Sequence, residues 1–159
     1  MQGQGLNPRD LITTARELIT TTDGKPRQSN LSRAISTAYY ALFHTLARCC
    51  ADMMIGGTAA VRSGGAWRQV YRALDHGSAK NACQNNDISK FPKEIQDFAN
   101  TFVTMQAKRH AADYDPKAKA FKSAVAIDID TVESVISGFN KSALKDRRAF
   151  AAWVLFKLR

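Results

Sequence analysis

The sequence contains little of what identifies several common protein classes. Its 159 residues include 3 Cys, 4 Pro and 9 Gly. The small, odd number of cysteines excludes a fully paired disulfide framework and favours a reducing, cytoplasmic environment. The low content of proline and glycine excludes a fibrous or disordered chain. We therefore expect one globular domain over residues 1–159.

Long apolar runs are also missing. The most apolar stretch, from Ala149 to Phe156, is far shorter than the ~18 residues that a membrane-spanning helix needs. The first ten residues, MQGQGLNPRD, contain no basic segment followed by an apolar run, so we expect no signal peptide. The chain is predicted to be cytoplasmic and to make no contact with a membrane.

Several motifs of cofactor and metal sites do not occur. The sequence has no CxxC or HxxxH pair, which argues against a zinc site. It has neither GxGxxG nor GxxxxGK[ST], the two common phosphate-binding loops, and no GxSxG nucleophile elbow. We therefore predict no metal and no cofactor.

Apolar residues recur instead at the spacing of a helix. Asn7 and Pro8 are a suitable cap and first residue for the first helix. No segment alternates apolar and polar residues as a strand would, so the prediction is all-α: an antiparallel bundle of three to four main helices plus short ones. The predicted helices span 8–22, 30–55, 91–112, 126–139 and 146–158, with a short helix ending at His76-Gly77 and a turn or two over 78–83.

The helix over 30–55 has two distinct stripes. One is apolar and should face the core: Leu31, Ile35, Ala38, Leu42, Leu46, Cys49 and Met53. The other is polar and carries Arg33, Thr37, Tyr40, His44 and Arg48. A solvated face would be richer in Lys, Glu and Gln. The second stripe therefore indicates either a polar seam between helices or the lining of a pocket.

The helix over 91–112 changes character along a single stripe. Ile95, Phe98, Ala99 and Phe102 are followed in the same direction by Gln106, Arg109 and Asp113. A charge on the core side must be paired or must face a cleft. Two interpretations stay open: a half-buried Arg109–Asp113 ion pair that closes the end of the bundle, or a polar cleft at that end.

The net charge is +9 and is unevenly distributed. Residues 105–122 hold five basic and two acidic side chains, and residues 141–159 hold six basic and one acidic. We expect both segments to flank the end of the Arg109 helix and to form a basic rim beside the polar cluster. Such a rim favours a phosphate-bearing partner, whose binding would depend strongly on salt.

Two segments carry a family resemblance. RAISTAYYALFHTL (33–46) and KRHAADYDP (108–116), with LDHG (74–77) between them, resemble the HEPN-domain proteins. The similarity is greatest to small bacterial HEPN-like proteins with an RxYYAxFH-type helix, and it covers roughly residues 29–140. It implies an antiparallel helical bundle, often dimeric across its long helices. It also implies an RNA- or nucleotide-related role, as in toxin–antitoxin or phage-defence systems.

HEPN ribonucleases pair an arginine with a histidine one to two turns further along the same helix. After Arg109 those positions hold Tyr114, Asp115 and Pro116. The hypothesis for a catalytic pair is therefore Arg109 with His44. The other candidate ligand-binding residues are Arg33, Tyr40, His76, His110, Asp113 and Tyr114.

Three functions follow from these residues. The first is binding of RNA or a nucleotide without cleavage. The second is metal-independent cleavage of RNA, in which a base takes the proton of the 2′-hydroxyl and Arg109 stabilises the developing charge. The third is a non-catalytic helical subunit that forms a homodimer or joins a cognate protein partner.

Overall fold

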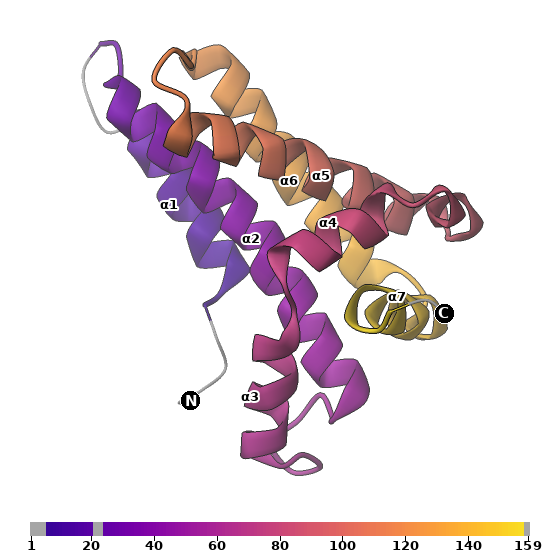
Figure 1. Ribbon diagram of the computed structural model, residues 1–159. Coiled ribbons are helices and arrows are strands. Elements are labelled where there is room, and N and C mark those ends of the chain that lie inside the picture. The colour runs from indigo at the N-terminus through magenta and orange to yellow at the C-terminus, as the bar shows by residue number, and fades with distance from the viewer. Residues whose placement is uncertain (1–5, 21–23, 158–159) are drawn as a thin grey trace.

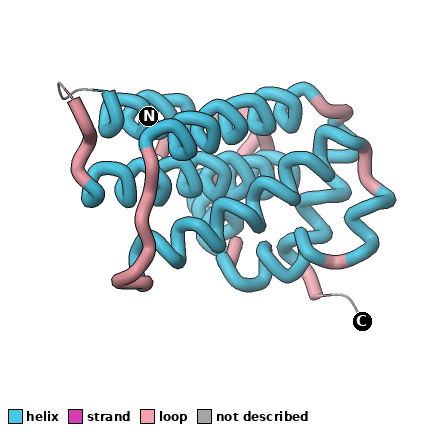
Figure 2. The backbone as a smooth tube through the Cα atoms, turned by 90° about the horizontal axis from the view of Figure 1, so that it is seen from above, coloured by secondary structure: helices cyan, strands magenta, loops and turns pink. Residues whose placement is uncertain are grey.

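The computed structural model describes residues 6–20 and 24–157, and these residues form helices and loops without any strand (Figure 2). The all-α prediction is confirmed. Thr21 and Thr22, placed in the first helix by the sequence, lie outside the described residues. The elements are α1 (Pro8–Thr20), α2 (Gln28–Met54), α3 (Gly64–Ala73), α4 (His76–Gln84), the 3-10 helix η1 (Asn86–Lys90), α5 (Lys93–Tyr114), α6 (Lys122–Lys141) and α7 (Leu144–Leu155).

The helices α1, α2, α5 and α6 run antiparallel to one another in succession, which is the predicted bundle (Figure 1). The short helices α3 and α4 are inserted between α2 and α5. Helix α3 packs against the second half of α2, and α4 lies against α5 and α7. Helix α7 packs across the end of the bundle, against α2 and α4. None of the helices in the described part of the chain is both long and apolar enough to cross a membrane.

Helix α2 is the centre of the fold. The predicted core stripe is confirmed, since six of its residues are buried and Met53 is half-buried. Burial extends beyond that stripe to Tyr39 and to small residues such as Ala34, Ala41 and Ala47. Small side chains let neighbouring helices approach α2 closely on several sides. The polar stripe of α2 therefore also lies in contact with other helices.

A second group of core residues is aromatic and joins the three C-terminal helices. Phe98 of α5 stacks on Phe139 of α6 with 4.4 Å between ring centroids. Both rings meet the ring of Phe150 of α7 edge-on, with 6.4 Å between centroids for Phe98 and 5.9 Å for Phe139. All three rings are fully buried. This packing holds α7 against the first half of α5, far from Arg109.

One helix boundary differs from the prediction in a way that matters for the site. His76-Gly77 was expected to end a helix, but His76 is the first residue of α4. The cause is Asp75, whose carboxylate accepts a hydrogen bond from the backbone N–H of Ser78 at 2.8 Å and so caps α4 at its start. The connection over 84–89 also forms a 3-10 turn, and α6 begins at Lys122 instead of residue 126.

The expected basic rim is wrong, because the two basic segments lie at different ends of the bundle. Asp113, at the end of α5, accepts a hydrogen bond from Ser36 in the first half of α2. Arg147 of α7 packs at Cys49 in the second half, where the Cys49 thiol faces its carbonyl oxygen. These two positions on α2 are separated by about 20 Å at the rise of an α-helix. The charge excess thus belongs to two separate surfaces.

We expect the Phe98→Ala substitution to lower the free energy of unfolding by about 3–5 kcal/mol, because it leaves a cavity between α5, α6 and α7. The matched control is Phe156→Ala, since Phe156 is 56% exposed; its effect should stay within about 0.5 kcal/mol. Urea unfolding followed by circular dichroism measures both. Equal losses for the two variants would contradict this description of the core.

Candidate functional site

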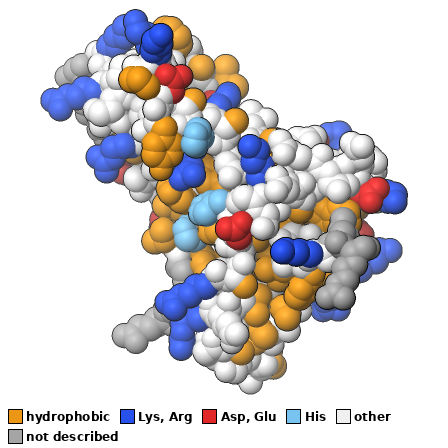
Figure 3. All heavy atoms as spheres, in the orientation of Figure 1, with side chains coloured by type: hydrophobic (Ala, Val, Ile, Leu, Met, Phe, Trp, Pro, Cys, Tyr) orange, Lys and Arg blue, Asp and Glu red, His pale blue; other side chains and the backbone are white. Residues whose placement is uncertain are grey.

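Four helices bring polar and aromatic side chains together on the polar side of α2. We call this group the tyrosine–histidine cluster: Tyr39, Tyr40 and His44 of α2, Tyr71 of α3, His76 of α4 and Arg109 of α5. Figure 3 shows histidine side chains at one face of the molecule, with both basic and acidic side chains near them. Tyr40, His44, Tyr71, His76 and Arg109 are each partly exposed. The cluster thus reaches the surface.

Arg109 is held by tyrosines more than by a carboxylate. Its Nη1 donates a hydrogen bond to the Tyr40 hydroxyl at 3.1 Å. Its guanidinium carbon lies 5.1 Å from the ring centroid of Tyr39 and 5.6 Å from that of Tyr40, a cation–π arrangement. In the predicted ion pair, Nη1 of Arg109 lies 4.0 Å from Oδ2 of Asp113, which is the outer limit for such a pair. The Asp113 carboxylate instead accepts a hydrogen bond from the Ser36 hydroxyl at 2.9 Å.

Two buried polar atoms of α5 lack a hydrogen bond within the described residues. They are Nε of Arg109 and Oε1 of Gln106. The amide nitrogen of Gln106 donates to the backbone oxygen of His76 at 3.3 Å, so α5 and α4 are joined here. A buried polar atom without a partner costs about 1–3 kcal/mol, and such atoms are uncommon outside functional sites.

The ring of His76 is fixed by a hydrogen bond and by aromatic stacking. Its Nδ1 lies 2.6 Å from the Tyr39 hydroxyl, and its ring stacks on Phe43 with 3.9 Å between centroids. Burial raises the pKa of Tyr39, so the phenol keeps its proton. That buried hydroxyl has Nδ1 as its acceptor, which places the proton of a neutral His76 on Nε2. His76 therefore presents Nε2–H as a hydrogen-bond donor.

His44 is held in the same way by a neighbouring helix. Its Nδ1 forms a hydrogen bond with the hydroxyl of Tyr71. Burial lowers the pKa of His44, and the nearby His76 and Arg48 lower it further. Burial also lowers the pKa of His76, and the nearby Arg109 lowers it further. Both histidines are thus neutral near pH 7, beside an arginine that keeps its charge.

The predicted pair, Arg109 and His44, lies in one cluster and is joined through Tyr40. The Tyr40 hydroxyl accepts from Arg109, and its ring centroid is 6.3 Å from that of His44 and 6.3 Å from that of His76. The sequence placed His76 only as a weak candidate at a helix end, whereas the structure places it between Tyr39 and Arg109.

The remaining candidates lie at the edge of the cluster or outside it. Asp113 is at the edge, through Arg109 and Ser36. His110 and Tyr114 are exposed and pack on each other with 4.9 Å between ring centroids. Arg33 is exposed on α2, one turn before Thr37. No hydrogen bond within residues 6–20 and 24–157 joins these three to the cluster.

Sequence reasoning did not identify Tyr39 or Tyr71 as candidate site residues. Each of them fixes a histidine ring. One signal was available: Tyr39 is in the middle of a long buried helix, and a buried phenol needs a hydrogen-bond partner. The identity of that partner was not predictable, because His76 is 37 residues away in the chain.

The cluster offers donors and proton-transfer groups but no obvious metal site or thiol nucleophile. In the described part of the chain, no three His, Cys, Asp or Glu side chains come close enough together to hold a metal ion. Burial raises the pKa of Cys49 and of Cys83 to about 12, so both thiols are protonated and unreactive at neutral pH. Arg109 and Nε2–H of His76 can donate hydrogen bonds to an anion.

Comparisons of the chain with models of protein families, with curated proteins and with solved structures gave no significant match. The function of the chain must therefore be inferred from its own side chains and their geometry.

We expect the protein to lose stability as the pH falls below 6.5. The pKa of each histidine is lower in the folded protein than in the unfolded chain, so the unfolded chain takes up protons first as the pH falls. Protonation therefore favours unfolding in the pH range between the unfolded-state pKa and the lower folded-state pKa. Urea unfolding at pH 7.5 and 5.5 measures this loss. The double variant His44→Gln/His76→Gln should show a smaller loss than wild type, while His110→Gln should match wild type. A double variant with an unchanged loss would contradict the neutral-histidine assignment.

Proposed function

We propose that the protein binds RNA at the tyrosine–histidine cluster, as a HEPN-like RNA-binding protein. The observation that carries this proposal is the state of Arg109. The guanidinium is 17% exposed, is held by two tyrosines and has its nearest carboxylate at 4.0 Å. A charged, oriented guanidinium without a close acid is a good partner for a phosphate.

The surroundings of Arg109 suit a nucleic acid. His76 adds a neutral donor, and the half-exposed ring of Tyr40 is next to the guanidinium. Tyr114, the last residue of α5, is 68% exposed, and it is followed by Lys117 and Lys119, which are exposed as well. Exposed aromatic rings between basic side chains are typical of sites where single-stranded RNA bases stack.

A second candidate is metal-independent cleavage of RNA, which the lowered histidine pKa values favour. Tyr71 is half-buried, so its hydroxyl can accept from Nδ1–H of His44 and leave Nε2 free as a base. His44 would take the 2′-hydroxyl proton, the 2′-oxygen would attack phosphorus, and the bond to the 5′-oxygen would break. The proton then passes to the 5′-oxygen, giving a 2′,3′-cyclic phosphate. Arg109 would stabilise the charge on phosphorus oxygens.

Gel-shift titration with a labelled single-stranded RNA, in chelator, tests the first candidate. Arg109→Ala should weaken binding at least tenfold, about 1.4 kcal/mol. The matched control is Arg148→Ala, an exposed arginine of α7 far from the cluster, which should change binding less than twofold. Affinity should fall steeply with salt. Equal weakening by the two substitutions would show that only net charge matters and would refute a site at Arg109.

The same samples, separated on a denaturing gel, test for cleavage. Cleavage predicts RNA fragments with wild type that disappear with His44→Ala and with Arg109→Ala. Bound but intact RNA after prolonged incubation would reject cleavage and leave binding. Absence of any RNA complex at low salt would reject both and favour a partner subunit or homodimer without RNA.

A further inference from the structure

The basic segment at the C-terminus surrounds a second feature, a cavity of about 720 Å³ between α1, α2, α6 and α7. We infer that this interhelical cavity is a binding site for a small organic phosphate, a phosphate group attached to an uncharged organic body. The inference does not depend on the RNA-binding proposal, because different residues carry it. Its lining includes Arg9, Thr45, Asp52, Glu133, Lys141 and Arg147.

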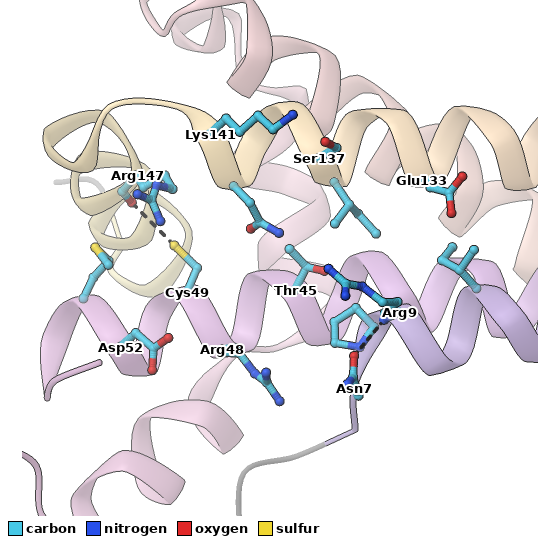
Figure 4. Close-up of a pocket in the computed structure, with 15 residues that line it drawn as sticks. Asn7, Arg9, Thr45, Arg48, Cys49, Asp52, Glu133, Ser137, Lys141 and Arg147 are labelled. Atoms are coloured by element: carbon cyan, nitrogen blue, oxygen red, sulfur yellow. Dashed lines mark hydrogen bonds between the residues drawn. The ribbon is translucent and has the colours of Figure 1, made fainter. Parts of the chain in front are cut away.

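Figure 4 shows how the helices enclose the space. Helix α6 lies on one side with Ser137 and Lys141, and α2 lies opposite with Thr45 and Cys49. Arg147 extends from α7 toward α2, and the start of α1 brings in Arg9. With Arg48 of α2, the cavity therefore has cationic side chains from four different helices. Such an arrangement depends on the tertiary fold and is not a solvated face of one helix.

The two acids of the cavity are both paired with cations from outside it. Asp52 accepts hydrogen bonds from Nε1 of Trp67 at 2.8 Å and from Arg62 at 3.2 Å. Glu133 accepts from Arg16 at 2.9 Å. Neither Arg62 nor Arg16 lines the cavity. Asp52 thus contributes little net negative charge to the space between the helices, whereas Glu133 shares Arg16 with a second acid of α6 and is only partly balanced.

Three cations of the cavity are not balanced in this way. Within residues 6–20 and 24–157, no carboxylate oxygen lies within 4.0 Å of the charged nitrogens of Arg9, Lys141 or Arg147. With Arg48 of α2, four cationic side chains line this partly open space, and they repel each other unless an anion lies between them. A phosphate group with two negative charges is matched to this site.

Arg147 has the geometry for such a contact. Its Nε donates to the backbone oxygen of Ser142 at 3.2 Å, which orients the guanidinium and leaves its terminal nitrogens as donors. An oriented guanidinium can bind two phosphate oxygens in parallel. Arg9 and Lys141 add charge from the other sides of the cavity.

The rest of the lining favours an organic body over inorganic phosphate alone. Ile12, Met53 and Ile136 form an apolar part of the wall, and Met53 and Ile136 are only half-buried without a ligand. The volume is within the range of about 300–1,000 Å³ that small-molecule sites have. A ring or other uncharged body would cover these apolar side chains while the phosphate contacts the cations.

Isothermal titration calorimetry with three probes tests the site. The probes are adenosine 5′-monophosphate, ribose 5-phosphate and adenosine, at pH 7.5 and physiological salt. We expect the two phosphates to bind and adenosine to bind at least tenfold more weakly than its monophosphate. The tighter of the two phosphates shows which kind of organic body the apolar wall takes. Adenosine binding as tightly as the monophosphate, or no phosphate binding at millimolar concentration, would overturn the inference.

Substitutions locate the binding. Arg147→Gln should weaken phosphate binding at least tenfold, whereas its neighbour Arg148→Gln should not change it. Arg9→Gln is a second test, because the exposed Arg9 side chain makes no hydrogen bond in the described structure and its loss should not disturb folding. Loss of binding in Arg109→Ala but not in Arg147→Gln or Arg9→Gln would place the ligand at the cluster and refute this site.

Discussion

The hydroxyl of Tyr39 is buried in the middle of α2, and a buried phenol needs a hydrogen-bond acceptor. Nδ1 of His76 is that acceptor, at 2.6 Å. Because His76 is the first residue of α4, this one bond holds α4 across α2 and brings His76 beside Arg109. Leaving such a group without a partner costs about 1–3 kcal/mol, so the position of α4 follows from a polar requirement inside an apolar core.

The net charge of +9 is explained by two surfaces with different chemistry. At the tyrosine–histidine cluster, one arginine is held by tyrosine rings and stands beside two neutral histidines. At the interhelical cavity, four cations from four helices line a space whose acids are already paired. The cluster is suited to a polynucleotide that reaches it from the surface, and the cavity to a small molecule enclosed between helices.

Much of the fold was predictable because α2 and α5 are long and strongly periodic. Leu31, Leu42 and Phe98 are buried as their spacing indicates. The candidate site was only partly predictable. The stripe of Tyr40 and His44 indicated a polar contact, but the role of His76 depends on Asp75, whose capping bond starts a helix where the sequence suggested an end. The basic rim was predicted wrongly, since periodicity does not tell which end of a bundle a terminal helix covers.

The sequence by itself determined an all-helical chain, the residues of its central helix that face the core, and an arginine on the core side of α5. These properties follow from local spacing along a helix, which the sequence contains directly. The tertiary structure alone decided which side chains meet. Tyr39 bonds to His76 and Tyr71 bonds to His44, although these residues belong to distant segments of the chain. Arg9 and Arg147 line one cavity from opposite ends of the sequence. These arrangements arise because each buried polar group and each packed ring restricts how the helices can cross.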